Sequence, residues 1–333
     1  MINPPSDISL ESSREAHSRI APHIVRTPLL RSKYPNAGEI FLKCDNLQVT
    51  GSFKVRGALN ALLGYQEQDS ETWAVMKEYG ITTCSSGNFA QGLAHATRKF
   101  GIPLTVVVPD FIRPSKLERI YQFNSDVRVL KIPYASWRET MVSSQHANAS
   151  GFFLSGESDF HVSCGIATIG LELLEDLPDV DAVLVPYGGG NLTYSLAKVL
   201  EFAGRRIDVY PVEISTGAPL RASVEAGTPQ DVDYEESFID GIGASFVIPE
   251  QFYRVREVIS DVLVVTPGEV AESLTSLLLT DKLLCEGAGA APFAAALKYA
   301  PFYGWRKPCV VISGGVIDSG VLADCIALQK SAA

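Results

Sequence analysis

Hydrophobic and polar positions follow two different periods along the chain. Short runs rich in β-branched residues, typical of buried strands, alternate with longer stretches in which apolar residues recur every three or four positions, as in amphipathic helices. We expect strands at Ile40–Cys44, Thr82–Ser85, Leu104–Val108, Val127–Ile132, Ala182–Pro186, Asp208–Val212, Val262–Val265 and Cys309–Ser313. We expect helices at Asn88–Phe100, Ser115–Phe123, Ser136–Ala149, Ile166–Leu177, Leu192–Ala203, Gly268–Asp281 and Gly289–Tyr299. This alternation predicts βαβ units and an α/β fold with parallel sheets covered on both faces.

Parallel sheets bind ligands where their strands end, so the turns from strand to helix are the places to look for chemistry. The first candidate is the run Thr50-Gly51-Ser52-Phe53-Lys54-Val55-Arg56-Gly57-Ala58, just before the apolar stretch Ala58–Leu63. A lysine amine that is kept deprotonated can form a Schiff base, and burial favours that state. A lone lysine is more often an ordinary surface residue, but its small neighbours single out Lys54.

The second candidate is the run Cys84-Ser85-Ser86-Gly87-Asn88-Phe89-Ala90-Gln91-Gly92, which follows a predicted strand and opens a predicted helix. The start of a helix offers unbonded backbone N–H groups and the positive end of the helix dipole, which suit a carboxylate. Ser86 and Asn88 add side-chain donors. A plain helix cap explains the same residues equally well, because Ser and Asn are favoured there.

The third candidate is the run Pro186-Tyr187-Gly188-Gly189-Gly190-Asn191-Leu192, again between a strand and a helix. Consecutive glycines have no side chains to block a phosphate, and their N–H groups can converge on it. A flexible turn is the alternative, but the position before a helix favours phosphate. The run matches neither the Walker pattern nor GxGxxG, which weakens the case for a nucleotide.

A fourth segment, Val311-Ile312-Ser313-Gly314-Gly315-Val316-Ile317-Asp318, ends the last predicted strand with a serine beside two glycines. The hydroxyl of Ser313 could meet a ring atom of a ligand at this place. Ser-Gly-Gly is also common in ordinary loops, so the segment gains weight only beside the other three.

Composition narrows the class of protein. The 333 residues carry a formal net charge of -10, which argues against nucleic-acid or anionic-membrane partners, because both need clustered Lys and Arg. No apolar run is long enough for a membrane helix, and the N-terminal residues lack the pattern of a secretory signal. Six scattered cysteines without a CxxC pair favour buried thiols in a reducing cytoplasm over zinc or disulfides.

Taken in order, these segments resemble the fold-type II pyridoxal-5′-phosphate (PLP) enzymes, most of all the serine/threonine dehydratase and serine racemase branch. The resemblance runs from about Arg26 to Val321. It is carried by Thr27-Pro28-Leu29, Lys43–Gln48, Gly51–Lys54, Ser85–Asn88, Gly170-Leu171-Glu172, Gly188–Gly190, Asp240-Gly241-Ile242, Glu286–Ala291 and Ser313–Gly315. It implies two parallel-sheet αβα domains with PLP between them: a large domain of residues 1–53 and 153–333, and a small mobile domain of residues 54–152.

The resemblance also implies roles for individual residues. Lys54 would carry PLP as a Schiff base, and Asn88, Ser313 and the glycine turn would hold its hydroxyl, ring nitrogen and phosphate. The cofactor set is Lys54, Phe53, Asn88, Gly188, Gly189, Gly190, Asn191, Leu192 and Ser313. The set for the substrate carboxylate is Ser85, Ser86, Gly87 and Asn88. Ser86 would face the side of PLP opposite Lys54, so Lys54 and Ser86 are the two catalytic candidates.

The expected reaction is α,β-elimination of a β-hydroxy amino acid such as serine or threonine, which gives a 2-oxo acid and ammonia. Alternatives are an amino-acid racemase that uses Ser86, a β-replacement synthase, and a phosphate-ligand binding protein without catalysis, against which Lys54 argues. The expected partner is a small amino acid, and a homodimer is left open. No segment after Ser313 is long enough for a regulatory domain, so none is expected.

Several positions depart from the family's pattern. Phe89 stands where the family usually has histidine, and Asn191 replaces a fourth glycine. Glu213 matches the first ligand of the divalent metal of the racemase-like branch, but Gly217 and Pro219 stand at the later positions, so we expect no metal. The run Ser158-Asp159-Phe160-His161 lacks the family's usual proline, which would reshape the entrance. The acidic run Glu172–Asp176 is expected to be a solvated helix face.

Overall fold

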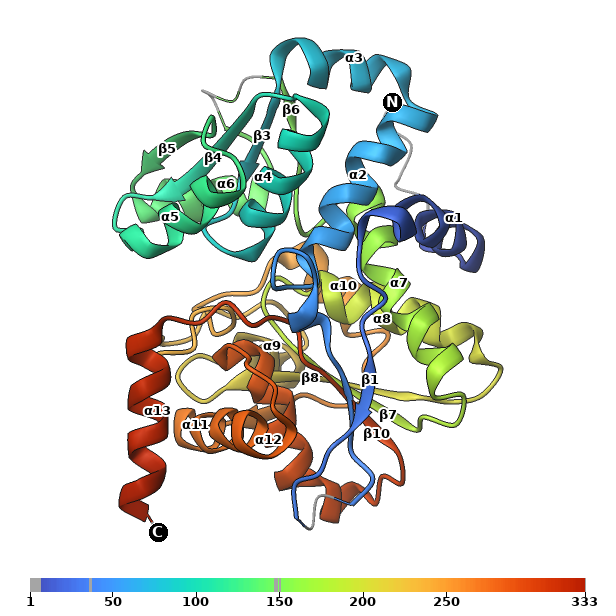
Figure 1. Ribbon diagram of the computed structural model, residues 1–333, viewed down its shortest axis with the longest axis vertical. Coiled ribbons are helices and arrows are strands. Elements are labelled where there is room, and N and C mark those ends of the chain that lie inside the picture. The colour runs from blue at the N-terminus through green and yellow to red at the C-terminus, as the bar shows by residue number, and fades with distance from the viewer. Residues whose placement is uncertain (1–6, 36–37, 147–148, 150, 333) are drawn as a thin grey trace. The chain divides into compact units, whose positions relative to one another are not determined.

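The computed structural model describes residues 7–35, 38–146, 149 and 151–332, and the chain forms two compact units (Figure 1). Unit 1 comprises Met1–Val25 and Phe53–Thr168, and unit 2 comprises Arg26–Ser52 and Ile169–Ala333. Residues 1–25 and 153–168 therefore group with the inserted segment, not with the unit that contains the C-terminal half. The mobility of a small domain stays a prediction.

Unit 1 is built on a four-stranded parallel sheet in the order β5-β4-β3-β6. Its strands are β3 (Ile81–Cys84), β4 (Leu104–Pro109), β5 (Arg128–Ile132) and β6 (Phe152–Phe153). Its helices are α1 (Leu10–Ile20), η1 (Ala21–His23), α2 (Lys54–Gln68), α3 (Ser70–Tyr79), α4 (Asn88–Phe100), α5 (Pro114–Phe123), α6 (Tyr134–Ser143) and the first half of α7 (Phe160–Asp176). The helix predicted at Ser136–Ala149 ends earlier, at Ser143, and residues 147–148 of that prediction lie outside the described residues.

Helix α2 is central to unit 1, because several other helices pack against it. Helices α1, α3 and α4 all pack against α2. Two glycines let α7 approach closely: a Cβ at Gly57 would lie 2.9 Å from the carbonyl of Val162, and one at Gly165 would lie 2.5 Å from the carbonyl of Arg56. This packing explains why residues 1–25 and 153–168 belong to unit 1.

Unit 2 is built on a six-stranded sheet in the order β1-β2-β10-β7-β8-β9, parallel except for the edge strand β1. Its strands are β1 (Leu29–Arg31), β2 (Phe41–Lys43), β7 (Ala182–Pro186), β8 (Asp208–Ile214), β9 (Leu263–Val265) and β10 (Pro308–Val311). Its helices, besides the second half of α7, are η2 (Asp45–Leu47), α8 (Asn191–Leu200), η3 (Glu201–Ala203), α9 (Pro219–Ala226), α10 (Pro249–Val255), α11 (Pro267–Ser276), η4 (Leu277–Asp281), α12 (Gly287–Tyr303) and α13 (Ser319–Ala332).

The core of unit 2 follows from the alternation of side chains along its strands. Leu42, Leu184 and Val212 project from three strands into one apolar cluster with α11 and α12. Residues one position along a strand point to the opposite face, where α8 contacts β7 and β8. Both faces are therefore covered by helices, as the sequence predicts for a parallel sheet.

The expectation that Glu172 lies on a solvated helix face is wrong. Its side chain is 1% exposed, and its carboxylate accepts a hydrogen bond from the Lys43 ammonium at 2.6 Å. The same ammonium donates to the carbonyl of Thr27 at 2.7 Å. Lys43 and Glu172 both lie in unit 2, and each neutralises a charge that would be costly to bury alone. Glu175 and Asp176, farther along α7, do face outward and pair with Arg26.

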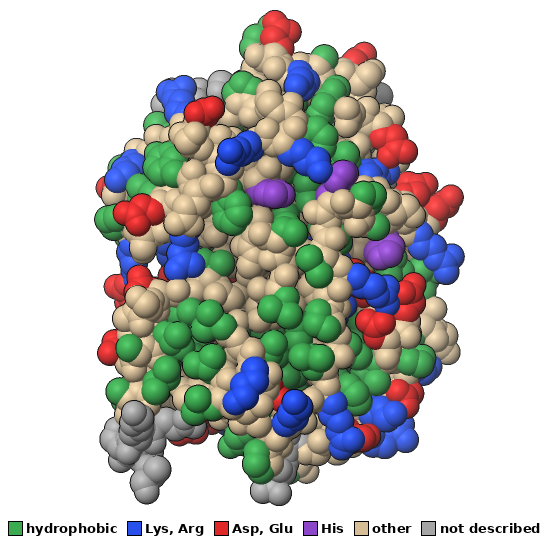
Figure 2. Space-filling view, in the orientation of Figure 1, with side chains coloured by type: hydrophobic (Ala, Val, Ile, Leu, Met, Phe, Trp, Pro, Cys, Tyr) green, Lys and Arg blue, Asp and Glu red, His purple; other side chains and the backbone are tan. Residues whose placement is uncertain are grey.

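One surface of unit 2 carries exposed apolar side chains, and Figure 2 shows such side chains gathered on the lower part of this view. The exposed large apolar residues of unit 2 include Leu30, Leu47, Val49, Leu279 and Leu284. Ser32 Oγ donates to Asp281 at 2.9 Å, which ties β1 to the end of η4. The Asn46 side chain donates to the carbonyl of Leu284 at 2.8 Å. No helix among the described residues is long and apolar enough to cross a membrane.

Candidate active site

Three adjacent strands of unit 2 bring sequence-predicted residues to one edge of its sheet. Strands β2, β10 and β7 are parallel neighbours, so their carboxyl ends meet. Strand β7 leads into the glycine turn, and β10 leads to Ser313. After β2 the chain returns to β10, where Ser52 forms an antiparallel bridge with Gly314. This is the edge at which parallel sheets bind ligands.

The glycine turn leads directly into α8 and leaves the start of that helix open. Gly190 is the N-cap residue with φ +102°, and the described residues provide no side-chain cap there. The Asn191 side chain points along α8, away from the glycine turn, because its Oδ1 accepts a hydrogen bond from the Ser195 hydroxyl at 2.7 Å. The Thr193 hydroxyl, in the first turn, is buried without a hydrogen-bond partner among the described residues. Backbone N–H groups and an unused hydroxyl together suit an anion such as phosphate.

Ser313 lies at the end of β10 and is 3% exposed. Its surroundings are held by backbone bonds, in which the N–H of Gly315 donates to the carbonyl of Gly51 at 2.8 Å and the N–H of Glu286 donates to that of Gly314 at 3.0 Å. A Cβ at Gly289 would lie 2.7 Å from the carbonyl of Gly314. A glycine is therefore required in α12 for the chain to run this close to the Ser313 turn.

In unit 1 the predicted lysine is the first residue of α2. Phe53 precedes it as the N-cap residue, and the Lys54 ammonium lies 5.1 Å from the centre of the Phe53 ring. Gly92 of α4 allows close contact, because a Cβ there would lie 3.1 Å from the Val55 backbone. The start of α2 is thus fixed against α4, the helix that follows the second candidate turn.

The turn Ser85–Asn88 leads from β3 into α4, as predicted. Gly87 is the N-cap residue of α4, and no described side chain caps this helix. Within the turn, the N–H of Gly87 donates to Ser85 Oγ at 3.4 Å, which is at the long limit for such a bond. An open helix start with hydroxyl groups beside it suits a carboxylate.

Glu157 is a candidate residue that sequence reasoning missed. Its carboxylate lies 2.8 Å from the Lys54 ammonium, and both side chains are 16% exposed. Glu157 also lines a small cavity with Ser85, Phe89 and Gly156. The signal that could have found it is the departure from the family's pattern around residues 158–161, one position further along the chain.

The structure therefore assembles the predicted residues as two groups. Unit 1 contains Lys54 and Phe53 at the start of α2 and Ser85, Ser86, Gly87 and Asn88 at the start of α4. Unit 2 contains Gly188, Gly189, Gly190, Asn191 and Leu192 at the start of α8, together with Ser313 after β10. The individual roles of these residues stay predictions, which the function proposed below puts to the test.

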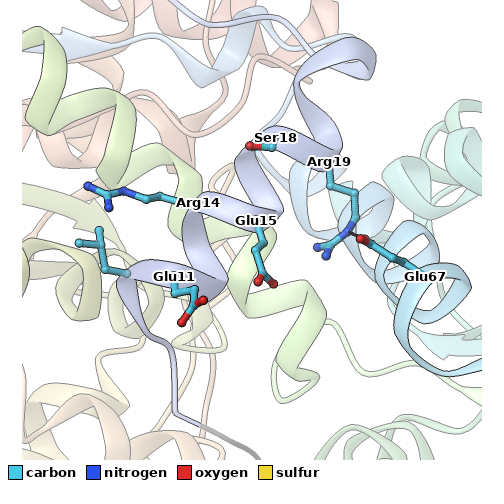
Figure 3. A pocket seen from close by; sticks show the side chains of 7 residues that line it. Glu11, Arg14, Glu15, Ser18, Arg19 and Glu67 are labelled. Atoms are coloured by element: carbon cyan, nitrogen blue, oxygen red, sulfur yellow. Dashed lines mark hydrogen bonds and ion pairs between the residues drawn. The ribbon is translucent and has the colours of Figure 1, made fainter.

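Two other features of the surface and core have ordinary explanations. A hollow along α1, shown in Figure 3, is lined by Leu10, Glu11, Arg14, Glu15, Ser18, Arg19 and Glu67. Arg19 pairs there with Glu67 at 2.7 Å, and none of the candidate turns reaches it. In unit 2, both carboxylate oxygens of Glu213 accept backbone N–H groups, from Leu220 at 2.9 Å and Arg221 at 2.8 Å.

The described residues contain no group of three or more His, Cys, Asp or Glu side chains placed to hold a metal. Glu213 instead receives the first turn of α9, which begins at Pro219. Burial raises the pKa of Glu213 to about 7, against the opposing effect of the two N–H donors. The absence of a metal requirement remains a prediction.

Comparison with known proteins decides the family. The family model described as pyridoxal-phosphate dependent enzyme matches residues 20–315. The chain belongs to this family. Within the PLP-dependent enzymes, it is 33% identical to the L-threonine ammonia-lyase of Thermotoga maritima over 95% of this chain and 77% of that protein. It is 34% identical to the catabolic L-threonine dehydratase of Escherichia coli K12 over 93% of this chain and 94% of that protein.

A solved structure agrees with the fold. The serine racemase of Dictyostelium discoideum matches with a TM-score of 0.81 at 28% identity, over 94% of this chain and all of that one. The two parallel-sheet units described above are thus those of a fold-type II PLP enzyme. The residues present also fit the cofactor, because unit 2 offers an open helix start with a buried hydroxyl for the phosphate and unit 1 offers a lysine amine.

Proposed function

We propose that the chain catalyses the PLP-dependent α,β-elimination of a β-hydroxy amino acid such as serine or threonine, with a 2-oxo acid and ammonia as products. The observation that carries this proposal is the contact in unit 1 between α2, which begins with Lys54, and α4, whose first turn has no side-chain cap among the described residues and so suits a carboxylate. A base and an anchor for the α-carboxylate thus stand on two helices in contact. The names of the threonine ammonia-lyase and dehydratase relatives support the same reaction.

The cofactor would be held by both groups of residues. Gly188–Leu192 would bind the PLP phosphate at the start of α8, Ser313 would meet the ring nitrogen, and Asn88 would bond the ring hydroxyl. Lys54 would attach PLP covalently, with Phe53 beside it. When bound, PLP supplies a sink for negative charge at Cα of the amino acid.

The protein's own residues would then orient the substrate and move its protons. The N–H groups at the start of α4, with Ser85, Ser86 and Gly87, would hold the substrate carboxylate and so fix the Cα–H bond toward Lys54. The Lys54 amine would take the Cα proton as general base. The Cβ–O bond breaks as the Cα–Cβ double bond forms, and the released enamine hydrolyses to the 2-oxo acid and ammonia.

Racemisation is the second candidate, and Ser86 favours it. A racemase returns a proton to Cα from the side opposite the first base, and Ser86 is the candidate that the motif places there. The solved serine racemase that resembles this chain supports keeping this reaction in view. A serine hydroxyl is a weak acid, however, so we propose that elimination dominates. A third reaction, β-replacement, would begin with the same loss of the Cα proton.

The deciding experiment compares the wild type with Lys54→Ala and Ser86→Ala. Each protein is incubated with a panel of L- and D-β-hydroxy amino acids, and 2-oxo acid and enantiomer ratio are followed over time. Lys54→Ala should abolish both reactions, since general-base catalysis alone accounts for roughly 10²–10⁴-fold in rate. Ser86→Ala should reduce racemisation far more than elimination. If the wild type inverts substrate faster than it forms 2-oxo acid, the racemase assignment replaces ours.

We also propose a cytoplasmic location, and the homodimer left open by the sequence is the assembly to test. All six cysteines are free and buried thiols, which suits a reducing compartment. Cell fractionation tests the location, and analytical ultracentrifugation of the purified chain tests the assembly. A monomer across the working range of concentration would reject the homodimer.

A further inference from the structure

The segment that carries Glu157 leaves the sheet of unit 1 beside the turn that carries Ser85. Strand β6 is the parallel neighbour of β3, with Ile81 paired to Phe152 and Thr82 to Phe153. The carboxyl ends of the two strands therefore lie side by side. Beyond β6, the pairing continues through a hydrogen bond from the N–H of Leu154 to the carbonyl of Thr82 at 2.8 Å. Glu157 follows three residues later and thus belongs to the same edge of the sheet.

The turn that presents Glu157 is fixed from both sides. The Ser155 hydroxyl accepts bonds from the N–H groups of Glu157 at 3.3 Å and Ser158 at 3.2 Å. Asp159 accepts the N–H of Val162 at 2.9 Å, at the start of α7, and the Tyr65 hydroxyl at 2.6 Å. The position of the Glu157 backbone is therefore set by its own turn and by two helices of unit 1, and does not depend on the contact with Lys54.

The contact with Lys54 places a carboxylate at the amine on which the proposed reaction depends. The 2.8 Å separation is that of a charge-assisted hydrogen bond. The low exposure of both side chains limits screening by water, so the interaction is stronger than that of a surface pair. Lys54 must be a free amine when it takes a proton from the substrate. In that state its N–H groups have the Glu157 carboxylate as a fixed hydrogen-bond acceptor.

Glu157 has no competing charge within its cavity. The other described residues that line it, Cys84, Ser85, Phe89, Thr140, Met141, Ser144, Phe153, Ser155 and Gly156, include no carboxylate, lysine, arginine or histidine. Burial raises the pKa of the Cys84 thiol to about 12, so this thiol is neutral. Glu157 thus supplies the negative charge on this side of Lys54.

We propose that Glu157 is a positioning residue for Lys54, which holds the free amine and stabilises the ammonium that forms when Lys54 takes the Cα proton. This inference rests on the proposed function only in taking Lys54 as the base. In the step, the nitrogen lone pair of Lys54 forms the new N–H bond, and the electrons of the Cα–H bond remain on the substrate. Glu157 exchanges no proton in this step. The Lys54 ammonium then gives its proton to the leaving β-hydroxyl oxygen, which departs as water.

The test compares the holoenzyme with Glu157→Gln and Glu157→Asp, and uses Glu67→Gln as the matched control. Glu67 is also a carboxylate of unit 1 in an ion pair, but with Arg19. The readouts are cofactor content from the visible absorbance band, folding from circular dichroism, exchange of the substrate Cα proton in D2O by NMR, and kcat and KM for elimination. A separate readout is the rate at which an acylating reagent modifies Lys54 in the full-length chain after cofactor removal.

Glu157→Gln should slow Cα-proton exchange and kcat by roughly 10- to 100-fold, the range of a hydrogen bond between charged groups. KM and cofactor content should stay unchanged, because neither the carboxylate anchor nor the phosphate site is altered. Lys54 should be acylated faster, since its amine no longer donates to a carboxylate that holds it in place. Glu157→Asp should recover part of the exchange rate, and Glu67→Gln should match the wild type.

The proposal is overturned if exchange in Glu157→Gln equals that of the wild type, or if exchange falls together with cofactor content or folding, which would assign a structural role. The outcome is separable from the fate of the proposed function. Exchange of the Cα proton is common to elimination, racemisation and β-replacement, so it reports on Glu157 even if no 2-oxo acid forms. Elimination at the wild-type rate in Glu157→Gln would reject this inference and leave the dehydratase assignment intact.

Discussion

Helices α8 and α9 of unit 2 differ in how the backbone N–H groups of their first turns find hydrogen-bond acceptors. Each follows a strand of one sheet and begins with N–H groups that need an acceptor. Helix α9 receives one from its own chain, because Glu213 accepts the N–H groups of Leu220 and Arg221. Helix α8 is preceded by glycines, with Gly190 as its N-cap residue, and has no side-chain cap among the described residues. One start is completed by folding, and we propose that the other is completed by the PLP phosphate.

This difference indicates which helix start is functional without reference to any motif. A structural helix start is satisfied internally, so its removal should cost stability. A ligand-binding start is kept open, so its alteration should cost affinity. The predictions below test this separation, beginning with the largest expected effect.

Removing the acceptor at the start of α9 should have the largest effect, which is a loss of stability. Glu213→Ala removes both acceptors and leaves the buried N–H groups of Leu220 and Arg221 without partners. At roughly 1–3 kcal/mol for each unsatisfied buried group, the free energy of unfolding should fall by about 3–4 kcal/mol. Chemical denaturation of the variant and wild type measures the loss. PLP affinity of the folded variant should be unchanged, and a selective loss of PLP would break the comparison.

Titration of Glu213 should make stability depend on pH. Burial raises its pKa from 4.5 to about 7, so the folded state favours the protonated form more than the unfolded state does. The resulting stabilisation is complete below about pH 4.5 and is lost as pH rises through about 7. At about 1.4 kcal/mol for each pKa unit, this share amounts to roughly 2–3 kcal/mol between pH 5 and 8.

The matching variant is Glu213→Gln, whose amide keeps an acceptor but cannot ionise. Its unfolding free energy should vary less between pH 5 and 8 than that of the wild type, as measured by urea denaturation at each pH. A wild type and a Glu213→Gln variant with parallel pH profiles would show that Glu213 does not titrate in this window.

Adding a side chain at the start of α8 should lower the affinity for PLP. Gly190 has φ +102°, and a Cβ there would lie 3.3 Å from side-chain atoms of both Gln251 and Val255. Gly190→Ala should therefore weaken PLP binding by about tenfold, since a strained backbone costs of order 1–3 kcal/mol. Fluorescence titration with PLP measures this. Gly227→Ala is the control. Gly227 lies at the C-terminal end of α9 with φ +74° and open space around it, so an alanine there strains the backbone without a steric clash.

Removal of divalent metal should have the smallest effect. The carboxylate of Glu213 already has two backbone partners, so α9 supplies the positive charge that a cation would bring. Activity after treatment with EDTA should match that of the untreated enzyme. A large loss that magnesium or calcium restores would show that other groups complete a metal site.

The sequence predicted the two sheets and the positions of the three candidate turns better than it predicted individual contacts. Eight of the ten strands among the described residues were predicted. The two that were missed are short: β1 has three residues and is largely exposed, and β6 has only two. Such short or exposed strands leave no periodic signal. They form because a neighbouring strand offers unpaired backbone groups.

Ion pairs between residues far apart in the sequence could not be predicted, for a different reason. Lys54 and Glu157 are 103 residues apart, and Lys43 and Glu172 are 129 residues apart. Local periodicity contains no information on such partners, so Glu172 was assigned to a solvated face. Lys54 itself was found because its neighbours in sequence are unusual, whereas Glu157 is distinguished only by the turn in which it stands.

The contact between Phe89 and Gly156 also constrains the history of this chain. A Cβ at position 156 would lie 2.8 Å from the Phe89 ring, so the large aromatic residue and any side chain at 156 exclude each other. An ancestor could acquire glycine first and then phenylalanine through viable intermediates, but the reverse order passes through a clash. Replacement of Gly156 by alanine should therefore be tolerated only after Phe89 is replaced by a smaller residue.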